Sequence, residues 1–342
     1  MEAIVVGEEQ RNAWEEFVLE CPRSIAWQSY DWSKVLRKNY DLDFYPIAAV
    51  EGGRIHGVLP LYRMKGGLLS KEKLISVPFA VAGGIACESE DAARLLFEKA
   101  VSFSGNTTGP GITLKHYKHS FNAGLRTDDN YYNRELRLSS GSQTILGALD
   151  QENRTRIEEA ENYGLKLEFP SDDISGFCRL LFRYNHMMGI PCVSSRWIRD
   201  LIDFGMYSLA LAKIGTTIFA GTLVKEFKDT VSFPFTSIPD LSPQSTAAAY
   251  GLYWKLIERF SEEGKEIFHS GRIPETGGVP AFRLGWGGIK YKYFYQYWPP
   301  TETRTEYSSK RGSKRKLLEN FWKKMPAVMA RAIGPNIVER FP

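Results

Sequence analysis

The chain has 342 residues, which predicts two domains at about 150 residues per domain. Hydrophobic residues make up 43% and charged residues 25%, which is typical of globular proteins and excludes the disordered and fibrous classes. The longest stretch without a charged residue covers 15 positions and contains three glycines and a proline, so the sequence predicts no membrane-spanning helix. The first residues include Glu2, Glu8 and Glu9 and lack a long apolar core, so we expect no secretion signal and a cytoplasmic protein.

Charge is distributed unevenly around the net value of +4. Residues 301–342 hold ten Lys or Arg and four Glu, whereas the other 300 residues hold 34 basic and 36 acidic side chains. The basic run over 310–316 is followed by an apolar helical stripe. A tail of this composition indicates either a solvated helix face or a contact with a polyanion, such as an acidic membrane surface or RNA. We expect the cations to face the polyanion and the apolar stripe to pack on the protein.

The four cysteines, Cys21, Cys87, Cys178 and Cys192, lie far apart and form no Cys-x-x-Cys pair. This spacing favours neither a disulfide framework nor a zinc site. We therefore predict four buried free thiols and no metal.

The first half of the chain alternates between apolar runs and amphipathic stretches. Two apolar runs separated by Glu51–Gly53 indicate a hairpin, and Glu90 and Asp91 begin an amphipathic helix. The predicted elements are helices over 10–20 and 90–102 and strands over 45–50, 54–61, 73–81 and 112–117.

The second half also alternates between apolar runs and amphipathic stretches. Gly164 and Gly189 are placed to end two helices, and Pro243 is placed at the first turn of a third. The predicted elements are helices over 151–164, 174–188, 195–204 and 244–262 and strands over 165–169, 207–214, 218–227, 230–237, 266–269 and 291–298.

The order helix, helix, three antiparallel strands, helix, strand, strand is that of an N-acetyltransferase (GNAT) domain. We therefore predict an α/β (α+β) fold of the acyl-CoA N-acyltransferase (GNAT) type, with mostly antiparallel sheets flanked by helices. The predicted boundaries are 1–148 and 149–300 for the two domains and 301–342 for a basic helical tail.

Three groups of motifs resemble those of the FemAB-like transferases, which form peptidoglycan bridges and have relatives in exopolysaccharide gene clusters. The resemblance spans about residues 20–342. The motifs are Trp27–Trp32 with Leu59–Leu61, Ser76–Phe79 and Gly83–Gly84; Arg154–Gly164 with Asn185–Pro191; and Gly264–Gly288.

The resemblance implies two tandem GNAT-like domains, with the tail packing back on the first. It also implies amide formation with no metal and no bound cofactor. The bridge-forming members move an amino acid from aminoacyl-tRNA to an amine of a cell-wall precursor, and relatives are described as acyl-CoA N-acyltransferases. Donor and acceptor would thus be an aminoacyl-tRNA or acyl-CoA and an envelope glycan or peptide precursor, which a lipid can carry.

The third motif group supplies the main catalytic candidates. Arg283 stands where the family has a Lys, and His269 stands where the family has an acid. Arg272 and Arg283 flank a glycine pair and could grip phosphates, or they could form ordinary surface ion pairs. His269 could act as a base, although a lone histidine on a strand is more often a structural residue.

Glu88 is the acid near Gly83–Gly84 that could deprotonate an amine, or else it only begins a helix. Arg154 and Arg156 match the family's basic site for a phosphorylated acceptor, although one of them could face solvent. Trp27 and Tyr30 are candidates for contacts with substrate among aromatic residues that mostly belong to the core.

The sequence lacks a glycine-containing motif that acetyl-CoA enzymes use to bind their donor. Acetyl-CoA enzymes of this fold class carry a glycine-containing loop before the main helix, where backbone amides hold the pyrophosphate. The corresponding stretch here, residues 239–246, has no glycine, and Ser242 or Ser245 is a candidate helix cap.

Three hypotheses follow. The first is a transferase that moves an aminoacyl or acyl group to an envelope amine, with direct attack in a ternary complex. The second is an acyl-CoA-dependent N-acyltransferase that acts on an amino sugar in polysaccharide biosynthesis. The third is a catalytically degenerate scaffold for envelope assembly, because the family acid is lost at position 269.

Overall fold

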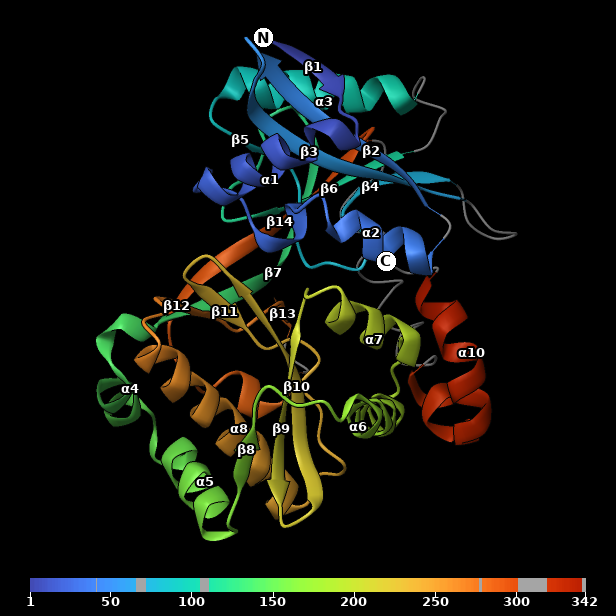
Figure 1. Cartoon of the computed structure of the whole chain (residues 1–342). Coiled ribbons are helices and arrows are strands. Elements are labelled where there is room, and N and C mark those ends of the chain that lie inside the picture. The colour runs from blue at the N-terminus through green and yellow to red at the C-terminus, as the bar shows by residue number, and fades with distance from the viewer. Residues whose placement is uncertain (41, 66–71, 105–110, 277–278, 301–318, 340–342) are drawn as a thin grey trace. The chain divides into compact units, whose positions relative to one another are not determined.

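The computed structural model describes residues 1–40, 42–65, 72–104, 111–276, 279–300 and 319–339. The chain divides into two compact units (Figure 1). Of the described residues, the first unit comprises those in 1–132 and 291–300, and the second comprises those in 133–290 and 319–339.

The first unit is a mixed sheet with helices packed on it. Strands β1 to β4 are successively antiparallel, α3 follows, and β6 then lies parallel to β4. The elements are β1 (Glu2–Val5), α1 (Arg11–Glu20), α2 (Trp32–Asn39), β2 (Leu42–Glu51), β3 (Arg54–Met64), β4 (Lys73–Ser76), β5 (Ala86–Cys87), α3 (Glu90–Ser104) and β6 (Gly111–Tyr117).

The second unit repeats this order. Strands β8 to β11 are successively antiparallel, α8 follows, and β12 lies parallel to β11. The elements are α4 (Ser142–Ala148), α5 (Gln151–Asn162), β8 (Lys166–Glu168), α6 (Ile174–Met188), α7 (Ser195–Asp203), β9 (Ser208–Ile214), β10 (Thr217–Phe227), β11 (Thr230–Ser232), α8 (Pro243–Glu262), β12 (Ile267–His269), β13 (Ile273–Pro274) and α10 (Ala327–Glu339).

The last strand of each repeat is exchanged. β7 (Arg126–Arg137) follows β6 in the chain, yet its residues 135–137 pair with β12 of the second unit. β14 (Ile289–Trp298) follows β12, yet its residues 293–298 pair with β6 of the first unit. Each unit therefore contains a strand that belongs in sequence to the other repeat. This is why the contact division differs from the predicted boundaries at 148 and 300.

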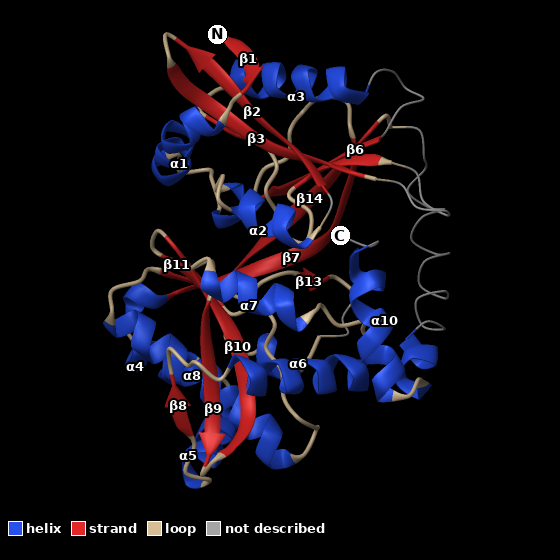
Figure 2. Cartoon of the chain, turned by 45° about the vertical axis from the view of Figure 1, so that its right-hand side comes forward, coloured by secondary structure: helices blue, strands red, loops and turns tan. Residues whose placement is uncertain are grey.

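Helix α8 is the centre of the second core. Twelve of its side chains are buried, among them Tyr250, Tyr253 and Trp254. It packs against β9 and β10, while α6 packs on the other side of these strands (Figure 2). In the first unit α3 packs against β2 and β3. The three-layer arrangement gives the second unit a rigid base on which the residues after β12 are placed.

Most predicted elements are present, including the β2–β3 hairpin and the helices α1, α3, α5, α6, α7 and α8. The prediction of buried thiols outside any disulfide is confirmed for all four cysteines. Strand β7 was not predicted because only Tyr131, Tyr132 and Leu136 of its twelve residues are apolar. The run over 73–81 forms a strand only as far as Ser76.

The described part of the tail contacts the second unit, although we expected it to pack on the first domain. The imidazole Nε2 of His186 on α6 lies 2.9 Å from the Met325 carbonyl, and α10 packs against α6. Gly189 ends α6 where a Cβ atom would lie 2.6 Å from the Glu319 carbonyl oxygen. The basic run over 310–316 lies outside the described residues. Within the described ranges, no helix has the length and apolarity needed to cross a membrane.

Candidate functional site

Arg283 ends a short 3-10 turn, Ala281–Arg283, that is anchored on both sides. Phe282 and Trp286 are each 3% exposed, and the Trp286 indole donates to the Phe282 carbonyl at 2.7 Å. The Trp286 ring stacks on Tyr253 of α8 with centroids 5.6 Å apart. The apolar neighbours therefore fix the backbone that carries Arg283, whose own side chain is half-buried.

The Arg283 guanidinium lies against the chain that leaves β12. Its Nη2 donates to the Ser270 carbonyl at 3.3 Å, and a Cβ atom on Gly271 would lie 3.2 Å from the same nitrogen. The buried Asn133 holds this loop, because its Oδ1 accepts from the Gly271 amide at 3.1 Å and from the Ser270 hydroxyl at 3.2 Å. In the described part of the chain, no carboxylate forms an ion pair with Arg283. A half-buried cation without an acid is a site for an anion.

Two tyrosines, Tyr253 and Tyr184, complete the surroundings of Arg283. Burial raises the pKa of both phenols and the nearby Arg283 charge partly opposes this, so both remain protonated at neutral pH. The Tyr253 hydroxyl lies 3.0 Å from the Thr236 hydroxyl, which donates to the Phe233 carbonyl. Either hydroxyl can donate in the Tyr253–Thr236 hydrogen bond, and a second side-chain hydrogen bond links Tyr253 to the Arg283 guanidinium.

Tyr184 differs from Tyr253 because its hydroxyl has no hydrogen-bond partner among the residues that the structure describes. The electrostatic interaction with Arg283 places the Tyr184 phenol in the neighbourhood of the guanidinium. The sequence analysis missed both tyrosines. Tyr184 follows Phe177, Leu180 and Leu181 at helical spacing on the buried face of α6, which is the pattern of a core residue.

The N-terminus of α8 is already occupied by a side chain of the protein. Oδ1 of Asp240 accepts from the Ser242 and Ser245 hydroxyls at 2.6 and 2.7 Å, and these bonds hold the pKa of Asp240 below its usual range. Ser242 caps the helix by accepting from the Ser245 amide at 3.2 Å, and Pro243 has no amide to offer. An incoming phosphate would find a carboxylate where a phosphate-binding helix presents free amides.

His269 and Arg272 both lie near Arg283 in the sequence, but the structure places them differently. His269 is 8% exposed at the end of β12, and its Nδ1 accepts from the Gly271 amide at 3.3 Å. A neutral ring in this tautomer carries its proton on Nε2 and has no lone pair left for an amine. The geometry does not favour the predicted base role. Arg272 is exposed, and the glycine pair at 277–278 lies outside the described residues.

Glu88 belongs to the first unit, and each of its two carboxylate oxygens contacts a basic side chain. Oε1 lies 2.8 Å from Arg54 Nη2, and Oε2 lies 2.8 Å from His56 Nδ1. The adjacent Ser89, rather than Glu88, caps α3 by accepting from the Ala92 amide at 3.2 Å. Glu88 joins β5 to β3 in this arrangement, and its predicted catalytic role stays a prediction.

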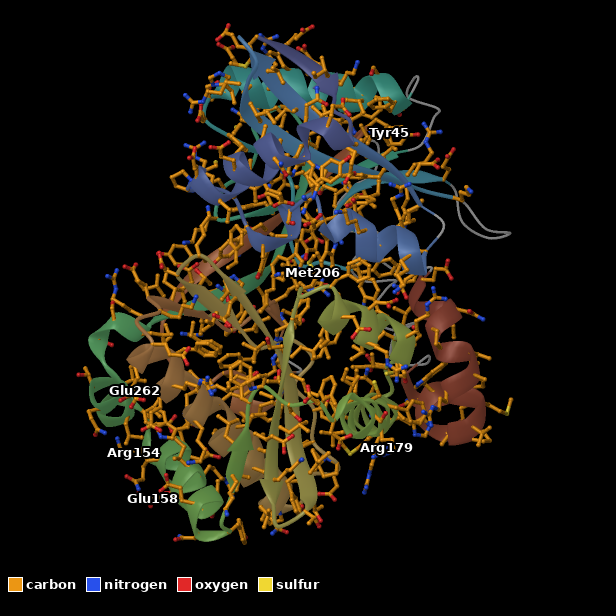
Figure 3. All side chains as sticks on the ribbon, viewed as in Figure 1. Tyr45, Arg154, Glu158, Arg179, Met206 and Glu262 are labelled. Atoms are coloured by element: carbon orange, nitrogen blue, oxygen red, sulfur yellow. The ribbon has the colours of Figure 1, made fainter. Side chains whose placement is uncertain are left out.

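Arg154 and Arg156 both lie on α5 (Figure 3, which labels Arg154). Arg154 donates to the Leu149 carbonyl at 2.5 Å and to the Gly147 carbonyl at 3.3 Å, so it caps the end of α4. Arg156 pairs with Glu159 at 2.9 Å. Each side chain has a structural role in this geometry, and their binding of an acceptor stays a prediction.

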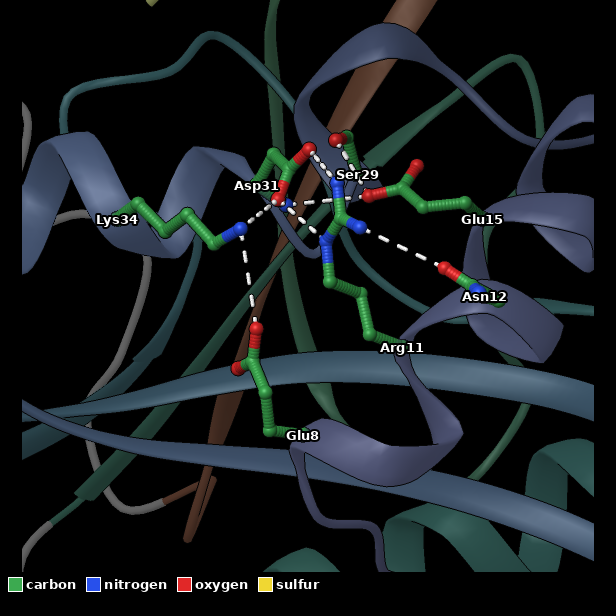
Figure 4. Close-up of polar contacts among 7 residues, drawn as sticks. All are labelled: Glu8, Arg11, Asn12, Glu15, Ser29, Asp31 and Lys34. Atoms are coloured by element: carbon green, nitrogen blue, oxygen red, sulfur yellow. Dashed lines mark hydrogen bonds and ion pairs between the residues drawn. The ribbon is translucent and has the colours of Figure 1, made fainter.

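Trp27 and Tyr30 precede α2 in the chain, and Figure 4 shows the polar cluster around Asp31 at the start of this helix. Trp27 is half-buried in a 3-10 turn, and Tyr30 is 6% exposed with its ring edge-on to Trp14 and Phe44. Asp31 is the hub of the cluster: Arg11 Nε donates to its Oδ1 at 2.7 Å, and Lys34 Nζ lies 2.8 Å from the same oxygen. The packing assigns Tyr30 to the core.

We expect Asp31→Asn to destabilise the protein by about 1–2 kcal/mol at pH 7, because a charge-assisted bond to Arg11 is lost. The hydrogen bond from Arg11 holds the pKa of Asp31 below its usual range. A lowered carboxyl pKa stabilises the fold above the unfolded pKa of about 3.9, and this stabilisation is lost as pH falls through the folded value. The unfolding midpoints of the wild type and of Asp31→Asn, measured at pH 7 and pH 3, give the stabilisation that the Asp31 charge contributes.

The difference between wild type and Asp31→Asn should shrink on acidification. The exposed Asp43, which has no ion pair in the described chain, provides the control Asp43→Asn. A destabilisation of equal size at both pH values would show that the Asp31 charge does not matter.

A cavity of about 180 Å³ lies between α6, α7 and α10, away from the residues around Arg283. Cys178, Cys192 and Arg331 are among the residues that line it. Burial raises the pKa of both thiols, that of Cys192 to about 11. Both are therefore protonated at neutral pH and are poor nucleophiles.

No protein-family model and no curated protein sequence matches this chain. Among solved structures, FemX matches with a TM-score of 0.66 and 12% identity over 86% of this chain and 97% of that chain. The C-terminal domain of a putative lysylphosphatidylglycerol synthetase from Agrobacterium fabrum matches with a TM-score of 0.57 and 14% identity over 84% and 91%. A tandem GNAT protein from the clavulanic acid biosynthesis pathway matches with a TM-score of 0.50 and 12% identity over 86% and 97%.

This chain has a tandem GNAT-like fold. The similarity confirms the predicted fold class, and the repeated order of elements in the two units agrees with it. At these identities the similarity concerns the fold alone.

Proposed function

We propose that the protein is an amide-forming transferase that moves an aminoacyl or acyl group to an amine of a cell-envelope peptide or glycan precursor. The observation that carries the proposal is the Arg283 guanidinium, half-buried beside Tyr253 and Tyr184 and without a carboxylate partner in the described chain. Such a cation suits the negative charge that develops on an ester carbonyl under attack.

The proposed reaction needs no covalent intermediate. The neutral amine attacks the donor carbonyl, a C–N bond forms, and the C–O or C–S bond to the carrier breaks. The Arg283 guanidinium and the Tyr184 hydroxyl donate to the oxyanion. The amine proton passes to the leaving oxygen or sulfur of the carrier. Tyr253 acts as a positioning residue, because its hydroxyl is hydrogen-bonded to the Arg283 guanidinium and to the Thr236 hydroxyl.

The N-terminus of α8 supports aminoacyl-tRNA over acyl-CoA as the donor. Asp240 accepts a hydrogen bond from the Ser242 hydroxyl, and Ser242 accepts one from the Ser245 amide, so these donors are not free to bind a pyrophosphate. The negative charge of Asp240 also repels a pyrophosphate. The names of similar structures include both kinds of donor chemistry: one is a lysylphosphatidylglycerol synthetase, and another is a tandem GNAT protein whose structure is titled as being without AcCoA. The choice of donor therefore rests on the α8 N-terminus.

The test is a donor comparison with the purified full-length chain and an envelope lipid extract. Aminoacyl-tRNA labelled in the amino acid and acetyl-CoA labelled in the acetyl group are offered separately, and label in the lipid and glycan fractions is counted. We expect label from aminoacyl-tRNA only. Label from acetyl-CoA would contradict the donor choice and favour acylation of an amino sugar. Label from neither would contradict the transferase proposal and favour an assembly scaffold.

A further inference from the structure

The apolar stripe of the tail divides into a buried and an exposed half. Trp322 and Ala330 are 4% and 0% exposed and pack on the second unit. The other large apolar side chains of the tail face solvent: Phe321, Val328, Met329 and Ile333 are 63%, 83%, 56% and 38% exposed. The structure therefore corrects the expectation that the whole stripe packs on the protein.

On α10 the exposed apolar residues share one side. Val328, Met329, Ala332 and Ile333 occupy adjoining positions over the first two turns, and all four are exposed. Figure 2 shows α10 packed beside α6, which covers the opposite side. These four residues, called the α10 apolar face below, form a contiguous surface that no described residue covers.

Two exposed lysines, Lys323 and Lys324, precede this face in the chain, whereas the Arg331 guanidinium lies over the Phe182 ring of α6 at 5.8 Å. Between Glu319 and Glu339 the tail carries Lys323, Lys324 and Arg331 and no acid. All three are exposed, and none forms an ion pair with a described residue. The surface thus combines aliphatic side chains with positive charge.

We propose that the α10 apolar face and its cations dock on an anionic lipid bilayer. A bilayer offers hydrocarbon for Val328 and Met329 and phosphate for Lys323 and Lys324. RNA would satisfy the cations but leave the aliphatic side chains in water, and a second copy of the chain would bring the same positive charge against itself. The proposal does not depend on the transferase activity.

The test is flotation of the full-length protein with vesicles of phosphatidylcholine alone or with one third phosphatidylglycerol. We expect binding to the anionic vesicles only. Each basic residue near an anionic surface contributes a factor of about five to the affinity, so Lys323→Gln with Lys324→Gln should weaken binding about 25-fold. Val328→Ser with Met329→Ser should weaken binding about tenfold or more, because less apolar surface is buried.

Matched controls come from exposed positions elsewhere in the second unit. Leu241, which is 69% exposed, gives Leu241→Ser, and the exposed Arg179 and Lys166 give a double Gln variant. Both controls should bind like the wild type. Absence of binding to anionic vesicles overturns the proposal, as does equal binding of the tail variants. Binding of an RNA hairpin through Lys323 and Lys324 without vesicle binding also overturns it.

Discussion

Arg283→Ala is expected to lower kcat for amide transfer by roughly 10²–10³-fold, the effect of removing one donor to a developing oxyanion. The substitution removes the cation between Ser270 and Tyr253, while Phe282 and Trp286 still anchor the turn. The KM for the donor should change less than kcat, because the interaction strengthens as the carbonyl becomes an oxyanion. Initial rates of label transfer at several donor concentrations measure both constants.

Two further variants sharpen this test. Arg283→Lys keeps the charge but loses the planar group, so it should recover only part of the rate. Arg179→Ala removes an exposed cation from α6 and should leave the rate unchanged (Figure 3). A rate for Arg283→Ala within threefold of wild type, with an unchanged unfolding midpoint, would remove Arg283 from the site.

Gly288→Ala should destabilise the protein by about 3 kcal/mol or more, because a steric clash adds to backbone strain. Gly288 has a φ of +89°, and a Cβ atom there would lie 2.5 Å from the Glu135 carbonyl oxygen and 2.6 Å from its carbon. Both contacts are with the backbone of β7, which cannot turn away as a side chain can. Urea unfolding of the second unit measures the loss.

The neighbouring glycine provides the control. Gly287 has a φ of +75°, and a Cβ atom there would meet no described atom within 4 Å beyond its chain neighbours. Gly287→Ala should therefore cost only the backbone strain of about 1 kcal/mol. Equal losses for the two variants would show that the contact with β7 does not set the position of this segment.

The order of elements was predictable because helices and strands of both units carry clear periodicity and end signals. Gly189 ends α6 and Pro243 begins α8, as the sequence indicates. The exchange of β7 and β14 was not predictable, since it depends on which strand edge each one meets. Strand β7 also lacks the apolar alternation that reveals a strand.

The site was predictable only where a motif marks it. Arg283 was found from its neighbours Phe282 and Trp286, whereas Tyr184 and Asn133 resemble ordinary helix and strand residues in the sequence. Glu88 and Arg154 were chosen by their positions in motifs of the similar family, and a motif does not reveal that their charged groups already bind Arg54 and the Leu149 carbonyl. Partners distant in sequence determine whether a charged group is available to a ligand.

In the proposed reaction, the second unit holds the reacting carbonyl against Arg283. The most direct measurement is an experimental structure with a stable donor analogue, an aminoacyl group joined to adenosine by an amide. We predict that its carbonyl oxygen lies about 3 Å from the Arg283 guanidinium and the Tyr184 hydroxyl. An analogue bound away from Arg283, or a CoA pyrophosphate seated on the α8 N-terminus in place of Asp240, would contradict the account.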